Sequence, residues 1–472
     1  MIDFQNILPE IFLTFLLLFL LVLGVYLKNS FLLIKKFTIL SLIICIPIVY
    51  LNFDNQILIL NNNYSINIFS NLLKIVILVS SAFSLIFTGQ YLKRAKIEKF
   101  EYMILILSST LGMFVMVSAN NLIGLYLGIE LQSLSLYVLS SIDRNSLKSS
   151  ESGVKYFVLG ALSSGLFLYG CSLIYGFTGS TNYLIINENF SVDNLGLIFG
   201  LVFIIVGLAF KISAVPFHMW TPDVYEGSPT PVTAFFALAP KVAGMGAFIQ
   251  ILFVAFSEAL TEWKSIIIFI SIASMVLGSV AAIGQTNIKR LMAYSSIGHM
   301  GYALAGIATG TLAGISATLT YIFIYVVMNV AAFTCILFFS RDKIYYEDIR
   351  DLGGLSKNHP LISACFCLIL FSLAGIPPLA GFFAKFYIFK AVIESEMYVL
   401  AIIGLLSSVV SAFYYLRVIK IMYFDKEKEK FDDISGLGMK FSLLVSSALI
   451  LFYFIGPSFL INLSDIASRV FN

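Results

Sequence analysis

Residues 195–218 read LGLIFGLVFIIVGLAFKISAVPFH, and this stretch decides which class of fold the chain adopts. The run from 195 to 216 is apolar except for Lys211 and Ser213, and it is long enough to cross a hydrocarbon core of roughly 30 Å as a helix. Pro216 interrupts that helix about one turn beyond the lysine. Broken helices commonly line transport cavities in membrane proteins, because their freed backbone groups need polar partners. The stretch therefore predicts a membrane helix with a role in transport.

Similar apolar runs recur along the whole chain. Of its 472 residues, 59% are hydrophobic and 12% charged, whereas an ordinary soluble domain carries about 25% charged residues. Reading the apolar runs between polar breaks gives about fourteen spans, near residues 10–27, 33–51, 69–92, 102–119, 122–142, 153–176, 195–216, 231–256, 264–284, 290–308, 313–340, 361–390, 397–423 and 440–463. We therefore expect an all-α polytopic membrane protein, with residues 1–472 forming a single transmembrane domain.

The loops between these spans indicate the orientation. Lysines and arginines gather in loops that follow odd-numbered spans, as in Lys93, Arg94, Arg144, Arg341 and Lys357. Loops that follow even-numbered spans hold almost none. Because cytoplasmic loops carry the excess of basic residues, both ends of the chain are expected on the outer face.

Little in the chain suggests metal, redox or nucleic-acid chemistry. Its five cysteines lie within or beside apolar runs without the paired spacing of a zinc or iron–sulfur site: Cys45, Cys171, Cys335, Cys365 and Cys367. The three histidines are scattered, and the net charge of +3 is small and forms no basic patch. We expect no bound cofactor, no metal and no nucleic-acid partner.

Several ionisable residues fall inside the predicted spans, above all Glu130, Lys211, Lys241 and Lys385. Each charge at the centre of a bilayer costs about 2.5 to 3.5 kcal/mol unless it is paired or hydrated. Glu130 lies in mid-span, so a structural ion pair is the main alternative to a functional role. Lys211 lies near the end of its span, where it could instead reach the surface.

Two of the lysines lie beside helix breaks of the same kind. Pro216 follows Lys211 in span seven, and Gly375 with Pro377 and Pro378 precedes Lys385 in span twelve. Spans seven and twelve are five apart, and an odd offset makes two repeats inverted in the membrane, as in many transporters. We expect approximate repeats over residues 102–256 and 264–423.

The types of buried residue favour protons over metal cations. A sodium site would need several carboxylate or carbonyl oxygens, and Glu130 is the only acid identified in mid-span. Burial can lower the pKa of a lysine toward neutral, where it both accepts and releases protons. His299 adds a group that titrates near physiological pH, with a structural role as its alternative. Lys155 lies just inside span six, where it could instead reach the surface.

Several motifs resemble the antiporter-like subunits of respiratory complex I. They are Glu130 followed by LQSL, KISAVPFHMWTPDVYEGSPTP at 211–231, Lys241, NIKRLMAYSSIGHMGY at 287–302, and GIPPLAGFFAK at 375–385. The chain is most similar to the N-type subunits, because M-type subunits carry glutamate where this chain has Lys385. L-type subunits also end in a long lateral helix for which this chain has no room.

The resemblance implies fourteen helices with two inverted five-helix repeats and broken helices seven and twelve. It also implies roles. Glu130 would pair with Lys211, Lys241 would be the central proton carrier, and Lys385 would be the gate toward the outer face. His218 and His299 would connect them, and Lys155 would be a further lysine of the family.

The resemblance further implies a proton-translocating subunit of NADH:quinone oxidoreductase that carries no redox centre of its own. NADH, FMN, iron–sulfur clusters and quinone would bind partner subunits. The neighbours would be the M-type and K-type subunits and the lateral helix of the L-type subunit. The location would be the bacterial cytoplasmic membrane, with the mitochondrial inner membrane as the alternative.

Two other functions remain open at this point. A subunit of a multi-subunit cation/proton antiporter would share much the same lysines. A structural membrane scaffold would use the buried charges only to hold helices together.

Overall fold

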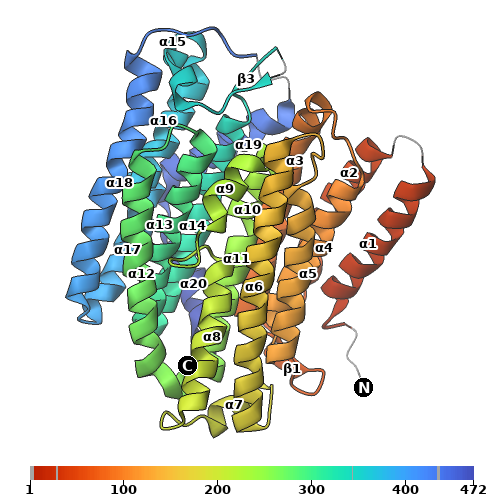
Figure 1. Ribbon diagram of the computed structural model, residues 1–472, viewed down its shortest axis with the longest axis vertical. Coiled ribbons are helices and arrows are strands. Elements are labelled where there is room, and N and C mark those ends of the chain that lie inside the picture. The colour runs from red at the N-terminus through yellow and green to blue at the C-terminus, as the bar shows by residue number, and fades with distance from the viewer. Residues whose placement is uncertain (1–4, 28–29, 343, 433–435) are drawn as a thin grey trace.

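Long helices in the computed structural model lie side by side in one bundle (Figure 1). The structure describes residues 5–27, 30–342, 344–432 and 436–472. The unbroken long helices are α1 (Leu8–Tyr26), α2 (Phe31–Tyr50), α3 (Ile68–Arg94), α4 (Glu101–Ser118), α5 (Leu122–Ser140), α6 (Leu147–Thr178), α12 (Leu260–Ile283), α13 (Ile288–Ala308), α14 (Leu312–Ile336) and α18 (Tyr398–Phe424).

Four further spans are divided into two helical parts. They are α8 (Leu195–Lys211) with α9 (Trp220–Gly227), α10 (Thr230–Ala237) with α11 (Ala239–Gln250), α16 (Pro360–Ala374) with α17 (Ala380–Glu394), and α19 (Leu437–Phe452) with α20 (Ser458–Ser468). Together the unbroken and divided helices coincide with the fourteen spans expected from the sequence. Within the described ranges, eleven helices are long and apolar enough to cross a membrane. The prediction of an all-α polytopic membrane protein is confirmed.

The breaks in spans seven and twelve are where the sequence predicted them. α8 ends at Lys211, and α16 ends at Ala374 before Gly375, which adopts φ +90°. The other two breaks were not predicted. Leu238 leaves helical geometry between α10 and α11, and Gly456 with Pro457 separates α19 from α20. These breaks were missed because a single proline is also compatible with the first turn of a helix that continues.

The two ends of the bundle differ in charge and in local structure. At one end, Arg94 of α3 donates a 2.6 Å hydrogen bond to Ser340 of β3 (Ser340–Arg341), which pairs with β4 (Ile344–Tyr345). This end, which also carries α15 (Leu355–Asn358), is called the basic end below (Figure 1). The opposite end, called the outer end, carries the hairpin of β1 (Ile57–Ile59) and β2 (Tyr64–Ile66) and the short α7 (Tyr183–Asn189). The C-terminus also lies at the outer end (Figure 1).

Glycines allow two helix pairs to approach closely. A methyl group on Gly112 of α4 would lie 2.8 Å from the carbonyl oxygen of Gly128 on α5. A methyl group on Gly278 of α12 would lie 2.5 Å from the backbone nitrogen of Gly298 on α13. Small residues at such crossings bring helix backbones together in membranes. The two pairs occupy spans four and five and spans nine and ten, so they are five spans apart.

Candidate functional site

Buried ionisable side chains come from four helices in the interior of the bundle. Lys211 ends α8, Lys241 lies on α11, His299 on α13 and Lys385 on α17, and all four are buried. α11 packs against α8 and α14, and α13 packs against both α14 and α17. The helices that carry these groups therefore form a contiguous part of the core.

Lys241 binds the backbone that the break in span seven frees. Its side chain is 1% exposed, and its ammonium donates hydrogen bonds of 2.8 Å to the Ile212 carbonyl and 2.5 Å to the Ser213 hydroxyl. The Trp220 ring lies 5.6 Å from the same nitrogen. Lys241 also lies in the first turn of α11, where the positive end of the helix dipole disfavours a cation. The carbonyl and hydroxyl acceptors offset that cost.

Lys385 is bound in a similar way at the break in span twelve. Its ammonium donates to the Ala374 carbonyl at 3.0 Å and to the Ser408 hydroxyl at 2.8 Å. The carbonyl belongs to the last residue of α16, which Gly375 leaves without its helical partner. A cavity of about 570 Å³ adjoins Lys385 and is also lined by Lys390 and Glu394, near the end of α17. This cavity leads from the buried lysine toward the outer end.

Glu130 and Lys211 do not form a direct ion pair. The ammonium of Lys211 donates a 2.7 Å hydrogen bond to Ser133 on α5. The Glu130 carboxylate, one turn away on the same helix, accepts a hydrogen bond from Ser164 on α6 and is only partly buried. The hydroxyl of Ser133 thus stands where a carboxylate was expected. The local sequence predicts which helices carry these groups, but not the helix rotation that decides which side chain faces the lysine.

His299 is enclosed by tyrosines. Its Nδ1 lies 2.6 Å from the Tyr321 hydroxyl and its Nε2 lies 3.3 Å from the Tyr415 hydroxyl. The ring is 3% exposed. Tyr302, one turn along α13, places its ring 5.0 Å from the Lys385 nitrogen. His299 and Lys385 therefore belong to one polar region of the core.

The two remaining candidates lie outside this region. His218 is half-buried in the segment between α8 and α9, and its Nδ1 has no hydrogen-bond partner among the described residues. Lys155 forms 2.7 Å ion pairs with both Glu151 and Asp223, and its side chain is 41% exposed. A small polar pocket of about 200 Å³ includes these charges together with Arg290, which also pairs with Asp223. The structure thus places Lys155 in a surface charge cluster.

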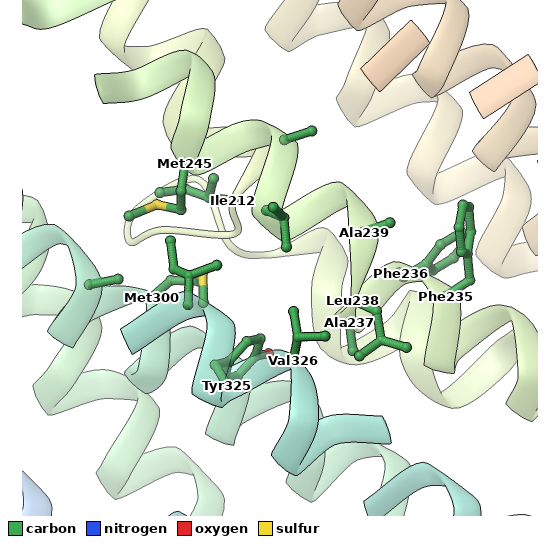
Figure 2. Close-up of a cluster of buried hydrophobic side chains, with 14 of the residues drawn as sticks. Ile212, Phe235, Phe236, Ala237, Leu238, Ala239, Met245, Met300, Tyr325 and Val326 are labelled. Atoms are coloured by element: carbon green, nitrogen blue, oxygen red, sulfur yellow. The ribbon is translucent and has the colours of Figure 1, made fainter. Parts of the chain in front are cut away.

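Apolar side chains from the helices that carry Lys241 and His299 pack together with neighbours from α14 (Figure 2). Figure 2 shows Met300 of α13 and Tyr325 and Val326 of α14 facing Ile212, Leu238 and Met245. The members of this cluster that flank the helix breaks are fully buried: Ile212, Leu238 and Met245. Apart from the tyrosine hydroxyl they offer no group that accepts or donates a proton. A proton passing this cluster therefore needs water.

Sequence reasoning missed two buried ion pairs. Lys74 on α3 is 1% exposed and lies 2.7 Å from Glu10 on α1, whose carboxylate also accepts a 2.7 Å hydrogen bond from Tyr64. Lys289 on α13 is 2% exposed and lies 2.6 Å from Glu347. Each lysine is close to a predicted span end, where exposure was the simpler expectation. The only sequence signal for these pairs was the presence of an acid elsewhere, namely Glu10 at a span end and Glu347 in a loop.

The described residues contain no group of three or more histidine, cysteine or acidic side chains able to hold a metal ion. The five cysteines are free thiols, and none of them forms a disulfide within the described residues. The chemistry available in the core is therefore that of lysine, histidine, tyrosine and serine groups.

Comparisons with known proteins agree with this chemistry. The family model described as "NADH:quinone oxidoreductase/Mrp antiporter, TM" matches residues 119–411. The "NADH-quinone oxidoreductase subunit N" of Pelagibacter ubique is 58% identical over 465 residues, which is 98% of each chain. A chain in the structure of respiratory complex I from Thermus thermophilus has a TM-score of 0.83 at 29% identity, covering 96% of this chain and 98% of that one. A chain of the Mrp complex from Dietzia has a TM-score of 0.85 at 21% identity, covering 99% and 97%, and shows a shared fold.

Proposed function

The chain belongs to the NADH:quinone oxidoreductase/Mrp antiporter family, within it to subunit N of NADH-quinone oxidoreductase, and from this premise we propose which of its residues carry protons. It is a multi-pass, proton-translocating membrane subunit of that complex, respiratory complex I. The central observation is that Lys211, Lys241 and Lys385 are buried and that no carboxylate of the described residues is in ion-pair contact with them. Each is bound by carbonyl or hydroxyl oxygens instead.

These oxygens suit a group that changes its charge. An ammonium donates to a carbonyl or hydroxyl oxygen, and a neutral amine retains N–H donors for the same acceptors. The lysine can therefore lose a proton without leaving a buried carboxylate unpaired, which would be far more costly. In this proposal Lys241 is the central carrier, Lys385 delivers protons toward the outer end, and His299 connects them.

Glu130 acts on Lys211 across the Ser133 hydroxyl rather than by contact. At an effective dielectric of about 20, charges roughly 8 Å apart interact by about 2 kcal/mol, enough to change the proton affinity of a neighbouring lysine. The apolar cluster of Figure 2 then serves as a barrier that conducts only when water enters it. Lys155 and His218 lie outside the buried group, so their share in proton transfer is secondary in this proposal.

The domain organisation follows the same premise. We propose that residues 1–472 form one antiporter-like domain with two inverted five-helix repeats, approximately 102–256 and 264–423. Two features support it. The glycine crossings recur in spans four and five and in spans nine and ten, and broken helices recur in spans seven and twelve.

The setting of the subunit is proposed from the family. The chain would act as part of a translocase without a redox centre of its own, while NADH, FMN, iron–sulfur clusters and quinone bind partner subunits. The neighbours would be M-type and K-type subunits and the lateral helix of an L-type subunit. The membrane would be the bacterial cytoplasmic membrane, because relatives such as the Pelagibacter ubique subunit are bacterial.

The test uses the assembled complex carrying Lys241→Met, which keeps the length of the side chain but removes its charge. NADH-driven proton uptake and quinone reduction are measured in inverted membrane vesicles. Both are expected to fall by about 10² or more, the usual scale for loss of an acid–base group, while the complex still assembles. Lys148→Ala is the matched control, since Lys148 pairs only with Glu226 on the surface.

Unchanged pumping in Lys241→Met would remove the carrier role. Loss of assembly without a pumping defect in the surviving complex would favour the scaffold function instead. Proton movement that depends on added sodium would favour the cation/proton antiporter, the alternative suggested by the shared fold of the Mrp chain.

A further inference from the structure

A chain of four buried polar groups runs through the C-terminal half of the bundle. The Tyr321 hydroxyl meets Nδ1 of His299, the Tyr415 hydroxyl meets Nε2, and the Tyr415 hydroxyl also lies 2.5 Å from the Ser295 hydroxyl. The residues come from α13, α14 and α18. All four are at least 97% buried. We call them the hydroxyl–imidazole chain.

The direction of this chain can be read from the helices. α13 begins at the basic end, where the Ile288 amide donates a 2.8 Å hydrogen bond to the Glu347 carbonyl. Ser295 precedes His299 by one turn and so lies about 6 Å nearer the basic end. α18 runs the opposite way and ends at Phe424 beside the basic-end loops. Ser295 and Tyr415 therefore lie on the basic side of His299.

Every member of the hydroxyl–imidazole chain can give one proton while it takes another. A hydroxyl group donates one hydrogen and accepts on its lone pairs, and a neutral imidazole donates from one nitrogen and accepts on the other. Such groups pass a proton along without becoming ions. By contrast, the side chains labelled in Figure 2 are apolar apart from the Tyr325 hydroxyl and do not form such a chain.

We propose that Ser295 and Tyr415 are proton-relay residues that supply His299 from the basic side of the membrane. This rests on the proposed function, because it assumes that His299 and Lys385 transport protons. In one transfer, water on the basic side gives a proton to the Ser295 oxygen, Ser295 gives its own hydroxyl proton to Tyr415, and Tyr415 gives its own to Nε2 of His299. Nδ1 then gives its proton to the Tyr321 oxygen, and Tyr321 passes its own hydroxyl proton on toward the outer end. Rotation of the hydroxyl groups and of the imidazole ring restores the starting arrangement.

The relay leaves a gap between Ser295 and the basic surface. Ser295 lies seven positions after Ile288 along α13, or about 10 Å of helix. Ordered water bridges polar groups over such gaps in protein interiors. At the far side of the gap, Glu347 is 27% exposed and pairs with Lys289, so a carboxylate in contact with solvent marks the mouth of the route.

The test is Tyr415→Phe in the assembled complex, with NADH-driven proton uptake in inverted vesicles as the readout. Proton uptake is expected to fall about tenfold, less than the 10² to 10⁴ typical of an acid–base group because water can occupy part of the lost position. The matched control is Tyr102→Phe. It removes a fully buried tyrosine hydroxyl of α4 that has no hydrogen-bond partner among the described residues.

Two further measurements separate a relay from packing. In a His299→Ala background, Tyr415→Phe is expected to cause no additional loss, because both act in one chain. Ser295→Ala, which changes far less volume, is expected to lower proton uptake in the same direction and keeps the test valid if Tyr415→Phe fails to assemble. Proton uptake in Ser295→Ala equal to that of the Tyr102→Phe control overturns the proposal. Loss of uptake in Lys241→Met together with normal uptake in both relay variants rejects the relay alone and leaves the proposed function standing.

Discussion

Buried lysines in this bundle fall into two groups that differ in their partners. Lys74 and Lys289 each lie 2.6–2.7 Å from a carboxylate, Glu10 and Glu347 respectively. Lys241, as deeply buried as either, has a carbonyl and a hydroxyl as its only acceptors within the described ranges. Lys211 and Lys385 resemble Lys241 in this respect. Burial alone therefore does not identify a proton carrier, and the kind of acceptor does.

The difference follows from the cost of changing charge. A lysine that contacts a carboxylate cannot lose its proton without leaving that anion unpaired, so its charge is fixed and its pair holds helices together. A lysine bound by neutral oxygens satisfies them in both charge states. Three changes to the protein test this comparison.

The largest expected effect comes from breaking the pair between α1 and α3. Glu10→Ala or Lys74→Ala each leaves a buried charge without its partner, which typically costs 3–5 kcal/mol. We expect either variant to lower the thermal stability of the purified complex or to reduce the amount of this subunit that co-purifies with it. The double variant Glu10→Gln with Lys74→Met leaves no unpaired charge and should recover much of the loss. Single variants as stable as the parent would show that the pair is not structural.

A carboxylate placed beside Lys241 should fix its charge, as the carboxylates beside Lys74 and Lys289 do. Ser213→Asp places an anion where the hydroxyl now accepts a 2.5 Å hydrogen bond, and aspartate tolerates the φ of +63° at this position. At a separation of about 4 Å and an effective dielectric of about 20, the pair would hold the lysine proton by about 4 kcal/mol. We expect an assembled complex whose NADH-driven proton uptake is nearly abolished.

Ser213→Asn is the matched control for this change. Asparagine has the same shape and the same tolerance of positive φ but carries no charge. It should leave most of the proton uptake intact. If the Asp and Asn variants pump equally well, the absence of a carboxylate near Lys241 has no functional meaning, and the comparison between the two groups of lysines fails.

The sequence predicted the membrane topology well because apolar length and proline or glycine placement are local properties. The breaks beside Lys211 and Lys385 were identified in this way. The partners of the lysines were not, because they depend on helix rotation and on contacts between distant spans. Ser133 rather than Glu130 contacts Lys211. Lys74, near the start of α3, contacts Glu10, near the start of α1. Lys74 lies about two turns inside α3 and was not among the residues selected from the sequence.

The break at Leu238 also could not be identified from local sequence alone. Pro240 was visible in the sequence, but a proline in the first turn of a helix and a proline that interrupts one look alike. Only the structure places Lys241 in the first turn of α11, facing the freed carbonyl of Ile212. The candidate carrier was thus correctly selected, while the reason for its position came from tertiary contacts.

The smallest effect is expected at Lys155, which has carboxylate partners like Lys74 but lies at the surface. Its side chain is 41% exposed and pairs with Glu151 and Asp223. Exposed pairs contribute about 0.2–1 kcal/mol and weaken with salt. Lys155→Ala should therefore change the stability of the complex by less than about 1 kcal/mol, and proton uptake should match that of the Lys148→Ala control. A fall in proton uptake comparable to that of Lys241→Met would place Lys155 on the proton route, and paired lysines could then no longer be assigned to structure alone.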